Sequence, residues 1–72
     1  MGFTMKAKEL IKFLEARGFW HERDGRHKVM SDGTHIVPIP EHAGDLKKGT
    51  LGNALRLAGL KISDAKEWKE RG

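Results

Sequence analysis

Residues 19–39 read FWHERDGRHKVMSDGTHIVPI, and this stretch decides the fold. Asp24-Gly25 and Asp32-Gly33 separate three apolar runs in it, and Asp-Gly is a strong signal for a tight turn between antiparallel strands. Proline cannot donate a hydrogen bond to a sheet, so Pro38 predicts that the third strand lies at a sheet edge. The stretch therefore predicts a three-stranded meander with strands at 19–23, 27–31 and 34–39.

The alternation of side chains leaves two ways of placing this sheet on a core. The alternating sets are Phe19, Met30, Val37 and Ile39 on one face, and Trp20, Val29 and Ile36 on the other. We expect the first set to be buried, because it holds more large apolar side chains across all three strands. His27 then points away from the core. If the first turn closes tightly at Asp24-Gly25, Glu22 lies opposite His27, where a carboxylate would favour the protonated imidazole and orient the ring.

Helical patterns flank the three strands. Apolar residues recur at helical spacing between Thr4, the expected N-cap, and Gly18, which is expected just after the C-cap. Thr50 is expected to cap a second helix that ends at Ala58-Gly59-Leu60, and a short helix follows within residues 61–72. The predicted fold class is α+β, with the order α-β-β-β-α and a short extra C-terminal helix.

Length and composition restrict the class of protein further. A chain of 72 residues is expected to form a single domain, 1–72, in which residues 1–4 could be a leader because Met5 could itself be a start. Fourteen Lys and Arg against ten Asp and Glu give a net charge of +4, which favours a polyanion as partner, nucleic acid first. No apolar run approaches the roughly 18 residues that span a bilayer, and no signal-peptide pattern precedes the first helix. We expect a cytoplasmic protein without a membrane partner.

The histidines and the absence of cysteine bear on metal binding. The chain has no Cys, so neither disulfides nor thiolate metal ligands are available. His21, His35 and His42 match no standard zinc spacing, and alternation puts the first two on the face opposite His27. We expect no metal and no cofactor.

Two further features admit two interpretations each. Lys47 and Lys48 are either solvated loop residues or phosphate contacts beside a helix start, where free N–H groups and the helix dipole favour an anion. Arg23, Arg26 and Lys28 could extend such a basic track from the neighbourhood of His27. Trp20, on the outward face of the sheet, could stack on RNA bases or anchor a protein partner.

In their order along the chain, these features resemble the HicA family of toxins from type II toxin–antitoxin systems. The likeness covers roughly Met5 to Leu60. Its elements are a Lys8-Glu9-Leu10-Ile11 helix ending in Gly18-Phe19, the Gly25-x-His27 turn, Val37-Pro38, His42, and Leu46-Lys47-Lys48-Gly49-Thr50-Leu51 leading to Ala58-Gly59-Leu60.

The resemblance implies a fold similar to a double-stranded RNA-binding domain and a metal-independent endoribonuclease that cleaves mRNA. It implies that activity depends on a single histidine, which matches His27, and that a HicB-type antitoxin masks this residue; DNA would be contacted only through the antitoxin complex. The expected RNA contacts are Arg26, Lys28, Lys47 and Lys48. Glu22, His42 and Trp20 are expected accessory residues, His42 first of all as a residue that orders its loop.

The sequence departs from the family pattern at two points. Arg26 stands where the family usually has Ser before the histidine, and the first hairpin is about a residue shorter. An arginine there could itself contact phosphate. Two other functions stay open at this stage: a non-catalytic RNA-binding module on the same scaffold, and a protein that acts mainly as half of an antitoxin complex repressing its own operon.

Overall fold

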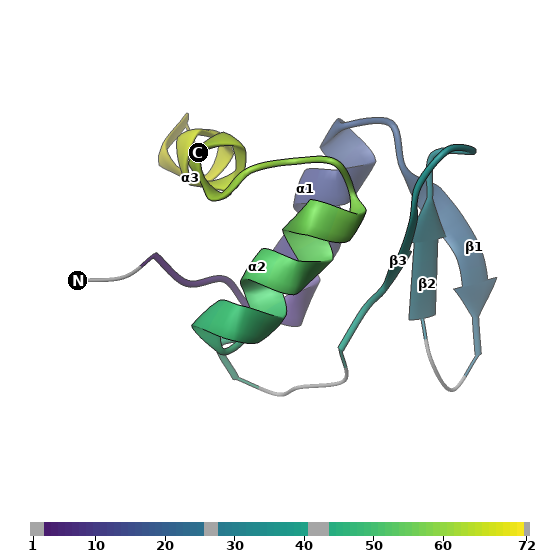
Figure 1. Cartoon of the computed structure of the whole chain (residues 1–72), viewed down its shortest axis with the longest axis horizontal. Helices are drawn as coiled ribbons and strands as arrows, with labels where there is room; N and C mark the ends of the chain where they lie inside the picture. Colours follow the sequence, from purple (N-terminus) through teal and green to yellow (C-terminus); the bar gives the residue numbers. More distant parts are fainter. Residues whose placement is uncertain (1–2, 26–27, 41–43, 72) are drawn as a thin grey trace.

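The structure, a computed structural model, describes residues 3–25, 28–40 and 44–71. Its elements follow in the order α1 (Ala7–Ala16), β1 (Trp20–Asp24), β2 (Lys28–Ser31), β3 (Ile36–Pro38), α2 (Lys48–Leu57) and α3 (Ile62–Arg71). α1 and α2 cover one face of the sheet, and α3 lies on the far side of these helices from the sheet (Figure 1). This is the predicted α+β class, consistent with a double-stranded-RNA-binding-domain-like fold plus an extra C-terminal helix. Within these described ranges, no helix is both long and apolar enough to cross a membrane.

The sheet has the order β1-β2-β3 with both pairs antiparallel, so β3 lies at an edge as Pro38 predicts. The predicted choice of core face is also confirmed. Phe19, Met30, Val37 and Ile39 are buried, whereas Trp20 and Ile36 on the other face are 48% and 63% exposed. We call this second side of the sheet the outer face.

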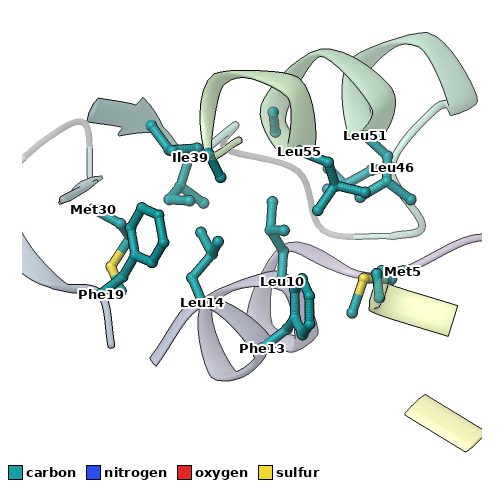
Figure 2. Close-up of a cluster of buried hydrophobic side chains, with 14 residues drawn as sticks. Met5, Leu10, Phe13, Leu14, Phe19, Met30, Ile39, Leu46, Leu51 and Leu55 are labelled. Carbon is teal, nitrogen blue, oxygen red and sulfur yellow. The ribbon is translucent and has the colours of Figure 1, made fainter. Parts of the chain in front are cut away.

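The core lies between the sheet and the two helices (Figure 2). Its fully buried large side chains come from the sheet, from α1 and α2, and from the segments just before these two helices. They are Met5, Leu10, Phe13, Leu14, Met30, Val37, Leu46, Leu51 and Leu55. In Figure 2, Leu14 points toward Phe19 and Met30 of the sheet side, while Leu46 and Leu51 lie together at the other end of the cluster. Each such side chain stabilises the fold by about 1.5–3 kcal/mol when it leaves water, so this cluster is the main source of stability.

α1 begins and ends by different means. The predicted Thr4 N-cap is wrong: the N-cap is Lys6, whose backbone N–H donates to Glu9 Oε1 at 2.9 Å. That hydrogen bond lowers the pKa of Glu9. The predicted C-terminal end is confirmed, because Gly18 has φ +92° and Phe19 N donates to Leu14 O at 2.9 Å. A left-handed glycine followed by this backward bond is a Schellman motif.

α2 ends in the same way. Gly59 has φ +72°, and Leu60 N donates to Leu55 O at 2.8 Å, as the Ala58-Gly59-Leu60 pattern predicts. The imidazole of His35 lies directly over this glycine: a Cβ on Gly59 would stand 2.7 Å from His35 Nε2. The end of α2 is therefore packed against the β2–β3 connection without room for a side chain.

A short bridge joins the starts of α1 and α2. Lys6 pairs with Asp45 in an isolated antiparallel bridge, and Leu46 N donates to Met5 O at 2.8 Å. Met5, which precedes Lys6, and Leu46, which follows Asp45, are both buried. The bridge therefore holds the two helix starts together, although they are about 40 residues apart in sequence.

α3 packs on α1 through both apolar and polar contacts. The ring of Trp68 lies 5.6 Å from that of Phe13, centroid to centroid, and so docks the terminal helix on α1. Lys69 Nζ donates to Thr4 O at 3.1 Å and lies 3.3 Å from Glu9 Oε2. The helix thus also holds the segment that precedes α1.

We expect Gly59→Ala to lower the free energy of unfolding by about 1–3 kcal/mol. The new methyl group would collide with the His35 ring, and the alanine would have to keep the left-handed backbone conformation of Gly59. Gly52→Ala is the matched control: nothing lies within 4 Å of its Cβ position inside α2, and we expect a gain of about 1 kcal/mol. Urea unfolding of the two variants beside the parent measures both effects. Equal stability of the two variants would contradict this account.

Candidate nucleic-acid interface

The start of α2 carries the lysine pair. The helix begins at Lys48 with Lys47 as N-cap, so the prediction that Thr50 caps it is wrong: Thr50 lies inside the first turn. The bridge at Asp45 explains this, because it fixes the chain just upstream and the helix can start as soon as the chain leaves it. Both lysines are therefore part of the helix start rather than of a preceding loop.

This helix start suits an anion. Lys47 makes no side-chain cap, and the first turn contains no acidic residue. The N–H groups of a first turn have no partner within their helix, and the helix dipole makes this end positive. Two lysines at such an end destabilise a helix by about 0.3–1 kcal/mol each unless an anion is present. The sequence thus retains an unfavourable charge arrangement that a bound phosphate would make favourable.

Two glycines leave the same part of α2 bare. Gly49 and Gly52 lie three residues apart, which places them on neighbouring positions of one helix face. Nothing lies within 4 Å of a Cβ at either position, so packing within the chain does not require glycine. Each glycine costs the helix about 1 kcal/mol relative to alanine. The consequence is a helix surface whose backbone a large ligand can approach, a feature that the sequence alone did not single out.

The end of β1 and the start of β2 lie at the same end of the molecule as the start of α2, the lower end in Figure 1. Asp24 pairs with Lys28 across the hairpin, and Lys28 O accepts a hydrogen bond from Ile39 N at 2.8 Å. Lys28 is exposed and shares the strand face of Met30, which is the face that carries the helices. Lys28, Lys47 and Lys48 thus belong to one end and one side of the fold.

Three predicted site residues lie outside the described residues. They are Arg26, His27 and His42. The catalytic assignment of His27, the phosphate contact of Arg26 and the loop-ordering role of His42 stay predictions.

The predicted tight turn at Asp24-Gly25 is wrong. Because Asp24 pairs with Lys28, three residues rather than two connect the strands, and the register also shifts between His21 and Arg23. Glu22 is the extra residue at this shift, so the register that would have set it opposite His27 is not formed. Its carboxylate instead accepts a hydrogen bond from Trp20 Nε1 at 2.8 Å, and the structure thus brings two predicted accessory residues together on the outer face.

The two histidines that the structure describes, His21 and His35, each lie beside a carboxylate. His21 Nε2 is 3.5 Å from Glu15 Oε2 of α1, and His35 Nδ1 is 3.0 Å from Asp32 Oδ2. Over residues 3–25, 28–40 and 44–71, no three His, Asp or Glu side chains come together in a way that could hold a metal ion.

Asp32 organises the β2–β3 connection. Its Oδ1 accepts hydrogen bonds from His35 N at 2.6 Å and Thr34 N at 2.9 Å, and its Oδ2 pairs with the His35 ring. The His35 backbone bond, then the His35 ring, then the Thr34 bond lower the pKa of Asp32 to about 2. An aspartate that accepts backbone bonds two and three residues ahead makes an Asx-type turn. Because Ser31 pairs with Ile36, four residues rather than two connect β2 and β3, so the tight turn that the Asp32-Gly33 pair predicts is not formed.

Fold and surface together define a small basic α+β domain of double-stranded-RNA-binding-domain-like architecture, with Lys28, Lys47 and Lys48 at one end. A family model described as "HicA toxin of bacterial toxin-antitoxin" matches residues 7–60. The chain therefore belongs to the HicA toxin family of bacterial toxin–antitoxin systems. α3 lies outside the matched residues. A comparison with curated proteins finds no match.

We expect the stability that Asp32 contributes to be lost in acid. Its pKa is about 2 in the folded chain against an ordinary value of 3.8, so the ionised form is favoured by folding. The contribution is complete above pH 3.8 and disappears as the pH falls through about 2. Asp32→Asn removes the charge at every pH. Urea midpoints of parent and variant should converge as the pH falls across this range, and a constant difference would contradict the assignment.

Proposed function

We propose that this protein is the toxin of a type II toxin–antitoxin system and acts in the cytoplasm as an endoribonuclease that cleaves mRNA. Membership of the HicA family is the observation that carries the proposal, because members of this family are generally known as mRNA interferases. The net charge of +4 and the lysines around the start of α2 suit a polyanionic substrate. A HicB-type antitoxin would neutralise the toxin by binding it.

The reaction needs one base and no metal. His27 would take the proton from a ribose 2′-hydroxyl, since imidazole titrates near neutral pH. The 2′-oxygen would then attack the adjacent phosphorus as the bond from phosphorus to the 5′-oxygen breaks. The products are a 2′,3′-cyclic phosphate on one fragment and a 5′-hydroxyl on the other, once the leaving oxygen takes up a proton.

The RNA backbone would be held at the start of α2. Lys47 and Lys48 provide charge, the uncapped first turn provides N–H donors, and the bare surface at Gly49 and Gly52 lets the phosphates approach the helix. Lys28 and Arg26 would continue the track toward His27. Such contacts fix the position of the strand but do not read its sequence.

We expect His27→Ala to lower the rate of RNA cleavage by about 10²–10⁴-fold while RNA binding and the fold are retained. Purified protein, RNA and excess chelator suffice for the test, with detection of cyclic-phosphate ends. His21→Ala is the matched control, since it removes an imidazole from the core-facing side of the sheet. Growth arrest on expression should follow the same pattern.

Two results would contradict the assignment. Cleavage by His27→Ala at the parent rate would exclude His27 as the base. Salt-sensitive RNA binding by the parent without any cleavage would favour the alternative, a non-catalytic RNA-binding module.

We expect the double variant Lys47→Ala/Lys48→Ala to bind RNA more weakly and with a shallower dependence on salt. Each lost phosphate contact should reduce the slope of log K against log salt concentration by about 0.7 for a single strand. Lys66→Ala, at an exposed position of α3, is the control for general loss of charge. If the double variant and the control give the same slope, the start of α2 does not contact RNA.

A further inference from the structure

Four residues follow one another at helical spacing on the side of α2 that faces away from the core. They are Gly49, Gly52, Asn53 and Arg56. None of the four is buried, and α2 crosses the front of the molecule in Figure 1 with no other helix or strand drawn in front of it. We call this side of α2 the open stripe. Arg56 is its only charged member.

The Arg56 side chain is held back toward the start of the helix. Its Nη2 donates to Asn53 Oδ1 at 2.9 Å, about one turn earlier in α2. Over residues 3–25, 28–40 and 44–71, no carboxylate pairs with Arg56, so its charge is not neutralised within this part of the chain. A guanidinium that is already oriented loses less conformational entropy on binding than one that is free.

The two side chains together offer hydrogen-bond donors. Asn53 Oδ1, the acceptor of the pair, already accepts from the arginine. The remaining guanidinium N–H groups and the Asn53 amide N–H groups are all donors. A planar, charged set of donors suits a group with paired acceptor oxygens, and a phosphate is the group of this kind that RNA carries.

The bare part of the open stripe lies between this donor set and the lysine pair. Lys47 and Lys48 stand at the helix start, and Asn53 lies five residues after Lys48, about 8 Å along the helix axis. Gly49 and Gly52 occupy the interval, and nothing lies within 4 Å of a Cβ at either position. Since phosphates of a helical strand follow one another about every 3.4 Å along its axis, the two cationic ends fit phosphates about two to three nucleotides apart.

We propose that Arg56 is a second phosphate contact of the RNA and that Asn53 positions it, so that the strand follows α2 lengthwise from the lysine pair across the two glycines. The proposal rests on the proposed function and gives its substrate a course along the helix. An arginine in the last turn also favours the helix dipole. The hydrogen bond to Asn53, however, draws the guanidinium away from the carbonyl end, where the dipole alone would hold it.

The first test removes one charge at two matched places. Arg56→Gln alters the open stripe, and Arg17→Gln removes an equally exposed arginine from the C-terminal end of α1. Fluorescence anisotropy measures binding of single-stranded 2′-O-methyl RNA, whose 2′-oxygen cannot attack phosphorus, at several salt concentrations. We expect Arg56→Gln to raise Kd by about tenfold and to lower the slope of log K against log salt concentration by about 0.7, and Arg17→Gln to keep the parent values.

The second test separates positioning from charge. Asn53→Ala keeps the guanidinium but frees it, so Kd should rise about threefold while the salt slope stays that of the parent. Arg56→Lys, which keeps the charge and loses the planar fork, should behave in the same way. The double variant Asn53→Ala/Arg56→Gln should bind no more weakly than Arg56→Gln alone, because Asn53 acts only through the arginine.

The outcomes separate the two proposals. Equal Kd and slope for Arg56→Gln and Arg17→Gln would overturn the second phosphate contact. So would loss of antitoxin binding by Arg56→Gln with RNA binding retained, because a protein would then occupy the open stripe. Additive losses in the double variant would overturn the role of Asn53. Absence of RNA cleavage by the parent would overturn the proposed function but not a titration in which Arg56→Gln alone loses salt dependence.

Discussion

The hydrogen bond from Leu46 N to Met5 O fixes where α2 begins and how the starts of α1 and α2 lie beside each other. It belongs to a bridge that joins the segment before α1 to the segment before α2, two parts of the chain that are far apart in sequence. The bridge buries Met5 and Leu46, one from each segment. Because the chain is fixed at Asp45, α2 starts at Lys48, and the lysine pair stands on the positive end of a helix instead of in a loop. The cationic end of the domain is thus a consequence of tertiary packing.

The sheet separates two kinds of surface. On one side the helices bury the core, and Lys47 and Lys48 stand at the start of α2. On the other side Trp20, Val29 and Ile36 stay without cover from the described elements. The sheet thus has one side that is built into the core and one side whose apolar side chains stay at the surface.

The sequence predicted well wherever one local rule decides the outcome. Alternation identified Phe19 and Met30 as core, and glycine placement identified both helix ends at Gly18 and Gly59. It failed where distant contacts decide, as at the helix starts predicted for Thr4 and Thr50, since a bridge between segments about 40 residues apart has no local signal. The tight turn failed because Asp24 pairs with Lys28, which leaves three residues in the connection, and because a register shift between His21 and Arg23 gives the two ends of the hairpin different registers. The lysine pair was found from its charge, whereas the bare helix surface beside it became visible only in three dimensions.

α3 stands apart from this design. It packs on α1 through Trp68 and reaches the segment before α1 through Lys69, and it lies outside residues 7–60, which the family model matches. None of these contacts involves the sheet or the lysines of α2. The helix nevertheless belongs to the same core, because Ala65 is fully buried in it and Trp68 packs against it. Losing α3 would therefore uncover Phe13 on the side of α1 that faces away from the sheet, and would weaken the domain without touching the lysines of α2.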